Sequence, residues 1–253
     1  MGPAALVARL KAIREPALRR RAFAESLATG DPEAWADTLA ALLRRAVATD
    51  DPDAAAAVDC LAHAVGDPLL TYAHKKDLYE AARARGHDAV ARLFLDASPN
   101  GPSDREVARA LEPERQVKPR GRALTLGERK SLARSHGRDA LVLLTKDPHP
   151  DVVAILLDNP HVVEDDVVRI AAARPGFAPA LAIVAEHPRW STRYAIRRAL
   201  VLNPATPMHL AVRLATTLRP ADLRELAADP LIAPPLRTHA AQLLSAARRA
   251  GRS

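Results

Sequence analysis

Histidines and acidic residues beside helix boundaries are the first candidates for chemistry in this sequence. His149, His161 and His187 each adjoin a proline, and imidazoles gathered along one edge of the fold would bind a metal ion. The x-Pro joints between helices, where these histidines lie, are exposed and tolerate polar residues, so we expect no metal site there. Asp165 and Asp166 open an expected helix, where carboxylates favour the positive end of the helix dipole. We therefore expect them to be structural rather than general acids or bases.

A second cluster combines arginine with aromatic residues in HPRWSTRYAIRR, residues 187–198, and predicts a helix that opens at Ser191. Arginine pairs with carboxylate or phosphate, and tryptophan and tyrosine are frequent interface anchors. Arg193 and Arg197 are four apart and would share a helix face. The alternative is that the two aromatic rings pack in the core while the arginine stems cover the surface. The predicted binding residues are Arg189, Trp190, Arg193, Tyr194, Arg197 and Arg198.

Catalytic motifs are missing from the sequence. It contains no G-x-G-x-x-G, G-x-x-x-x-G-K-[ST], H-E-x-x-H or G-x-S-x-G pattern. Cys60 is the only cysteine, which excludes an intrachain disulfide and fits a reducing compartment. Cys60 lies in the apolar run AAAAVDCLAHAV, which favours a small buried side chain over a reactive thiol. We therefore predict a protein that is not an enzyme and that has no cofactor.

Residues 147–230 repeat themselves, and this repeat determines the expected architecture. Residues 147–186 and 187–228 each contain an x-Pro start, an Asn-Pro and an Arg-Pro, separated by apolar runs. Three prolines recur after 40, 44 and 45 residues: Pro148 with Pro188, Pro160 with Pro204, and Pro175 with Pro220. A period near this length is typical of stacked helical repeats.

The segments between these prolines are predicted to be helices. Proline lacks an N–H and pushes the preceding residue out of the α region, so each Asn-Pro and Arg-Pro should end a helix. Val153, Leu156 and Leu157 recur at helical spacing. Thr206 is expected to cap a helix that begins at Pro207. A helix of about ten residues is marginal alone in water, so each must pack against its neighbours.

The sequence thus predicts an all-α solenoid of stacked short helices, about 12–14 in number and without a sheet. Residues 1–96 are expected to form an N-terminal helical bundle or irregular helical repeats, in which Asp-Pro pairs start several helices. Residues 97–123 form a basic linker with one short helix at 104–111, and residues 124–250 form the C-terminal repeats. The earlier helices are expected at 32–48, 52–65, 69–85 and 87–96.

The net charge of +7 is unevenly distributed. Residues 1–122 hold 19 Lys and Arg against 18 Asp and Glu, whereas residues 123–253 hold 18 against 12. This excess either attracts an anionic partner or reflects a biased Ala, Arg and Pro composition. No apolar run reaches the length of a membrane span, and the first residues carry charge too early for a secretory signal. We therefore expect a cytoplasmic protein without a membrane span.

The stretches LTLGERKSLARSHGRDALVLLTKDPHPDVVAILLDNP and RRALVLNPATP resemble an uncharacterised bacterial α-solenoid family. That family is similar to leucine-rich-repeat variants and to HEAT or armadillo-like repeats, and the resemblance covers residues 124–247. Leucine-rich-repeat variants can carry a cysteine-bound iron–sulfur cluster, which a chain with one cysteine cannot hold. HEAT-like families mostly imply protein binding, and a minority, the alkylpurine DNA glycosylases, imply DNA binding with base excision.

Repeat architecture without a catalytic motif favours a non-enzymatic scaffold that binds a protein partner through a concave or basic face. The alternative is a nucleic-acid-binding HEAT-like protein, including a DNA glycosylase-like one. Neither hypothesis requires a small-molecule cofactor.

Overall fold

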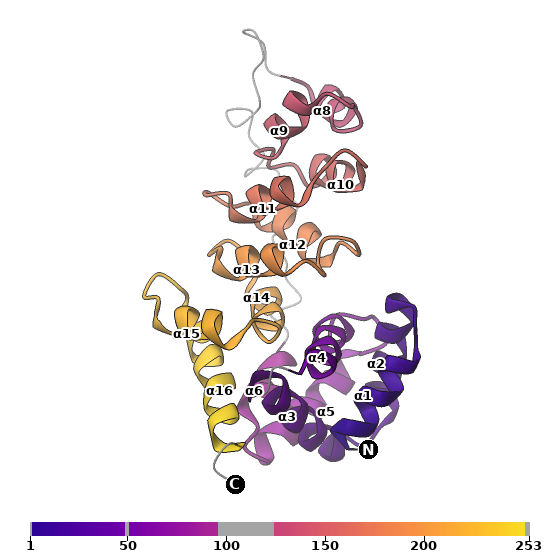
Figure 1. Ribbon diagram of the computed structural model, residues 1–253, viewed down its shortest axis with the longest axis vertical. Coiled ribbons are helices and arrows are strands. Elements are labelled where there is room, and N and C mark those ends of the chain that lie inside the picture. Colours follow the sequence, from indigo (N-terminus) through magenta and orange to yellow (C-terminus); the bar gives the residue numbers. More distant parts are fainter. Residues whose placement is uncertain (1, 49–50, 96–123, 251–253) are drawn as a thin grey trace. The chain divides into compact units, whose positions relative to one another are not determined.

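A computed structural model describes residues 2–48, 51–95 and 124–250. These residues form 15 α-helices and no β-strand (Figure 1), so the expectation of an all-α protein is confirmed for them. The number of helices in the described residues exceeds the predicted 12–14. The predicted linker at 97–123 and its helix at 104–111 lie outside the described residues.

The helices group into two compact units. Residues 1–97 and 211–253 form unit 1, and residues 98–210 form unit 2. The first and the last described helices belong to the same unit, because the helix at 234–250 packs on those at 32–48 and 88–93. No described helix is both long enough and apolar enough to cross a membrane.

Unit 1 is built around the long helix α3. This helix packs against α1, α4, α5, α6 and α16. The helices of the unit are α1 Pro3–Ala12, α2 Pro16–Thr29, α3 Pro32–Ala48, α4 Pro52–Ala64, α5 Tyr72–Ala84, α6 Asp88–Leu93, α15 Pro220–Ala228 and α16 Pro234–Ala250, with most of α14 Met208–Ala215. Leu39 and Leu42 of α3 are fully buried, and Cys60 of α4 is a buried core residue, as the sequence predicted.

Unit 2 stacks its helices in chain order, as Figure 1 shows from α8 to α13. They are α8 Leu126–Ala133, α9 Arg138–Leu144, α10 Pro150–Asp158, α11 Glu164–Ala172, α12 Ala178–Glu186 and α13 Tyr194–Leu202. Helix α10 packs on α8 and α12, and α11 packs on α13. In each of these three pairs a helix contacts the one two positions along the chain.

The Asn-Pro joints end helices as predicted. Helix α10 ends at Asp158 with Asn159 in extended geometry, and α13 ends at Leu202 with Asn203 in the same geometry. In both cases the proline that follows excludes the α region for the asparagine. Helix α14 behaves differently, since it ends at Ala215, well before the predicted stop at Arg219-Pro220.

Asn159 connects two helices in addition to ending one. Its buried side-chain amide donates hydrogen bonds to the carbonyl oxygens of Ala133 and Ser135, at 2.8 and 2.9 Å, at the end of α8. Its side-chain oxygen accepts the backbone N–H of His161, across the proline. One residue thereby ends α10, forms an Asx turn and supplies donors to carbonyls that the helix geometry leaves unpaired.

Asn203 repeats this arrangement at the next joint. Its amide donates to the carbonyls of Ala171 and Ala173, at 2.8 and 3.0 Å, at the end of α11, and its oxygen accepts the N–H of Ala205. Gly176 allows this close approach, because a Cβ there would lie 2.8 Å from both the Asn203 side-chain oxygen and the Ala205 Cβ. The repeat seen in the sequence is therefore also a repeat of hydrogen bonds.

Three expected helix starts are shifted in the structure. The helix expected from Ser191 begins at Tyr194, because Trp190 turns into the core and the backbone N–H of Arg193 bonds to its carbonyl. The helix expected from residue 69 begins at Tyr72 behind a Thr71 capping box. The helix expected at Pro207 begins at Met208, and the Thr206 hydroxyl before it donates to the Leu200 carbonyl.

The asparagine contact gives a direct stability test. We expect Asn159→Asp to lower the free energy of unfolding by about 2–4 kcal/mol, because a carboxylate keeps the acceptor for His161 but offers no donor to two buried carbonyls. Pro160→Ala is the control, with an expected cost of roughly 0.5–1 kcal/mol through a freer unfolded chain. Urea unfolding followed by circular dichroism measures both. Equal costs for the two variants would contradict a specific role for the amide.

A buried histidine in unit 1 predicts sensitivity to acid. His239 of α16 is fully buried, and burial together with the charge of Arg92 lowers its pKa to about 3, although the Val212 backbone acts in the opposite direction. The folded pKa lies below the ordinary value of 6.5, so between these pH values only the unfolded chain takes up the proton. His239 should therefore reduce the free energy of unfolding as pH falls from 6.5 toward 3.

We expect His239→Leu to flatten this dependence by on the order of 1 kcal/mol per pH unit in that window. Urea unfolding at a series of pH values between 4 and 7 measures the slope. A slope identical in the two proteins would mean that His239 titrates similarly in the folded and unfolded states.

Candidate functional site

Trp190, the central residue of the predicted arginine and aromatic cluster, lies in the core. Its side chain is 2% exposed, and its indole N–H donates to the Leu157 carbonyl at 2.8 Å, in the last turn of α10. Trp35 does the same in unit 1, where its indole N–H donates to the Ser26 carbonyl in the last turn of α2. Of the two interpretations of Trp190, the structure supports the core residue, so its ring is not a surface anchor.

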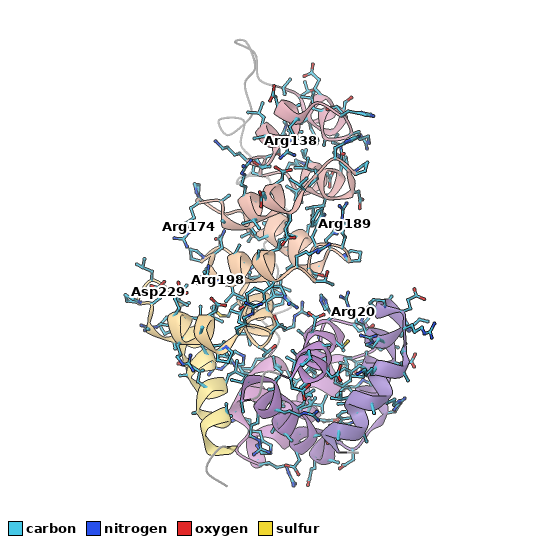
Figure 2. All side chains as sticks on the ribbon, in the orientation of Figure 1. Arg20, Arg138, Arg174, Arg189, Arg198 and Asp229 are labelled. Carbon is cyan, nitrogen blue, oxygen red and sulfur yellow. The ribbon has the colours of Figure 1, made fainter. Side chains whose placement is uncertain are left out.

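The arginines of the cluster do not form one patch. The guanidinium of Arg189 lies over the Trp190 ring at 4.2 Å, and that of Arg197 lies 5.9 Å from the Tyr194 ring. Figure 2 shows Arg189 and Arg198 on opposite sides of the stacked helices of unit 2. Arg189 and Arg198 are therefore close in the chain but lie on two different faces.

Arg193 and Arg197 differ in how far their side chains are exposed. Arg193 is exposed and precedes α13 in extended geometry, whereas Arg197 is half-buried within the helix. The backbone N–H of Arg197 bonds to the Arg193 carbonyl, so the two remain one turn apart as expected. Their differing exposure leaves Arg193 as the accessible cation of this pair.

The three joint histidines have structural roles. His149 and His187 each accept a backbone N–H two residues ahead through Nδ1, as the asparagines do through oxygen. His161 instead packs its ring against that of His136, with centroids 4.9 Å apart. Burial lowers the pKa of His149, and neighbouring charges act in both directions. Within the described ranges, no three His, Cys, Asp or Glu side chains are grouped to hold a metal.

A groove of about 590 Å³ in unit 2 is the better candidate site. The turn after α9 and the chain from α11 into α12 form its walls. Its apolar lining includes Ile170, Phe177 and Leu181, and three cationic side chains also line it, from Lys146, Arg169 and Arg174. All three cations are exposed. The arrangement combines a hydrophobic floor with positive charge.

Nothing acidic in the groove lining is free to neutralise these cations. Asp147 is the acidic residue among the lining side chains, and both of its carboxylate oxygens accept from Arg129 Nη1, at 2.6 and 2.7 Å. This ion pair is buried, and the Asp147 carboxylate also accepts the N–H of His149. The groove therefore keeps its positive character although an aspartate contributes to its wall.

The groove cations are held only loosely by the protein. Arg169 lies 3.7 Å from Asp166, whose carboxylate is engaged more closely by Arg138 at 2.6 Å. Burial acts to raise the pKa of Asp166, but Arg138 and the Val163 N–H outweigh this, so the pKa is lowered and the carboxylate stays charged. Arg169 is consequently the more weakly paired of the two arginines around Asp166.

The other two cations stand beside proline joints. Arg174 precedes Pro175 and donates one hydrogen bond to the Leu202 carbonyl at 2.9 Å, at the end of α13. Figure 2 shows Arg174 projecting from the same side of unit 2 as Arg198. Lys146 precedes Asp147-Pro148, and no carboxylate of the described chain is ion-paired with it. Both cations are therefore held at helix ends.

The sequence analysis did not predict this groove. The available signal was that Lys146 and Arg174 each stand next to an x-Pro joint, where a side chain is held at the surface. Arg169 gave no such signal, because it lies within α11 and shares the groove with Lys146 only in the tertiary structure. Proximity in the chain favoured the cluster at 187–198 instead.

Comparisons with known proteins identify no family for this chain. No protein-family model matches the sequence, and neither the curated proteins nor the solved structures contain a significant match. The resemblance to HEAT-like repeats therefore remains an interpretation of the sequence pattern.

The burial of Trp190 predicts the effect of its removal. We expect Trp190→Ala to cost about 3–5 kcal/mol of unfolding free energy, the range for a large core side chain. Trp190→Phe should cost less, since it keeps most of the apolar volume and loses mainly the bond to Leu157. Urea melts of both variants measure this order. A melt unchanged in Trp190→Ala would contradict a core position.

Proposed function

We propose that this protein is a non-enzymatic helical-repeat scaffold that binds a protein partner through a basic surface of unit 2. The observation that carries the proposal is the groove between successive repeats, with an apolar floor and three weakly engaged cations. Interfaces between proteins commonly combine an apolar centre with charged groups that select the partner.

The recurring hydrogen bonds support the scaffold part of the proposal. Asn159 and Asn203 make equivalent contacts one repeat apart, each joining the end of one helix to the end of another. A surface held in this way needs little ordering when a partner binds, which lowers the entropic cost of association. We further propose that the repeats form a HEAT or armadillo-like α-solenoid, the arrangement that the spacing of the prolines favours.

Nucleic-acid binding is the competing function, and it is motivated by the charge excess in the second half of the chain. A nucleic acid is bound mainly through its phosphates, so a protein that binds it presents cations along an extended track. The groove cations instead surround apolar side chains, which a phosphate backbone would leave uncovered. This favours a protein ligand.

Affinity capture separates the two functions. The full chain is immobilised and exposed to a native lysate with and without nuclease, and captured proteins are then produced and tested for direct binding by calorimetry. We expect at least one captured protein to survive nuclease treatment and to bind the purified chain at a fixed stoichiometry. Capture that disappears with nuclease, together with direct binding of an oligonucleotide, would replace the proposal with the nucleic-acid function.

A further inference from the structure

We infer that the groove lined by Lys146, Arg169 and Arg174 binds an extended acidic peptide segment that inserts an aliphatic side chain between the carboxylates. This inference rests on the proposed function and specifies the partner's chemistry. Its first support is charge complementarity: three exposed cations line the groove, and Arg129 already neutralises Asp147. Carboxylates of a ligand would therefore meet positive charge without a competing protein carboxylate in the lining.

The shape of the lining selects a peptide with an apolar residue. Ile170 and Leu181 are buried at the groove floor, and Phe177 is half-buried beside them. An aliphatic side chain seated there would remove both its own surface and that of Phe177 from water, and apolar burial contributes roughly 25 cal/mol per Å². A polyanion without apolar groups would gain only the electrostatic part.

The chemistry of each cation fits carboxylate recognition. Arginine presents five N–H donors, of which Arg174 uses one on the Leu202 carbonyl. Arg169 keeps only its long contact of 3.7 Å to Asp166, whose carboxylate Arg138 already binds. Lys146 supplies a compact charge on a flexible stem. Two arginines and one lysine around an apolar floor thus match a short pattern of carboxylates on either side of an aliphatic residue.

The test uses the full chain and a fluorescein-labelled peptide, Gly-Ser-Glu-Glu-Leu-Glu-Glu-Ser-Gly, followed by fluorescence anisotropy at low and at physiological salt. We expect saturable binding that weakens with salt, because exposed ion pairs are screened. Replacing Leu by Gln in the peptide should weaken binding at least threefold, and replacing every Glu by Lys should abolish it. A labelled oligothymidylate serves as the nucleic-acid comparison.

Paired protein variants locate the contact. Lys146→Glu with Arg169→Glu should weaken peptide binding by about tenfold or more, because reversal replaces attraction by repulsion at two exposed positions. Arg193→Glu is the control: it reverses one exposed charge of unit 2 outside the groove lining, and binding should change less than twofold. Circular dichroism and urea melts confirm that the variants stay folded.

Several results would overturn the inference. These are no binding of the acidic peptide, equal binding of the Leu and Gln peptides, or tighter binding of the oligothymidylate. Loss of binding in Arg193→Glu but not in the groove variant would assign the acidic contact to the arginine cluster instead. A captured protein partner whose binding is unaffected by the groove variant would overturn this site while leaving the scaffold function intact.

Discussion

Short helices leave the carbonyl oxygens of their last turn without partners inside the helix, and the rest of this structure depends on how those oxygens are satisfied. Helices α10 and α13 have nine residues each, so about four carbonyls in each are affected. Asn159 supplies donors to the end of α8, and Trp190 supplies one to the end of α10. Because each donor comes from another element, satisfying the backbone also fixes which helices are neighbours.

The proline joints combine three functions in few residues. Proline ends the helix, the preceding asparagine or histidine accepts the N–H beyond the proline, and the asparagines also donate to a neighbouring helix end. Leaving any of these buried polar groups unpaired would cost free energy, so the residue types at the joints are restricted. At Asp147 a charged residue takes this position: its carboxylate accepts the N–H of His149 and forms a buried ion pair with Arg129 of α8.

The same joints explain how a surface for binding arises from a regular stack. Lys146 and Arg174 stand beside two of these joints, and their side chains are exposed and line the groove. The packing of α11 and α12 then brings apolar side chains to the space between these cations. A repeat that is built for stability therefore presents a charged and partly apolar groove without any special catalytic residues.

The positions of most helices followed from the sequence. Proline limits the backbone of its own residue and of the one before it, so Asn159 and Asn203 ended helices as expected, and apolar residues at helical spacing marked the buried faces. These are local effects, which neighbouring residues determine. The candidate site could not be predicted from neighbouring residues alone. Of the patch expected at 187–198, Arg189 and Arg198 lie on different faces and Trp190 is buried in the core.

The sequence by itself thus determined that the chain is helical, where many of its helices stop, and that its joints carry polar residues. Only the tertiary structure decided which carbonyl each joint side chain reaches, that Trp190 lies inside, and that Lys146, Arg169 and Arg174 line one groove. The physical reason is the distance along the chain over which each interaction acts. Backbone stereochemistry acts between adjacent residues, whereas hydrogen-bond partners and groove walls come from helices separated by a whole repeat.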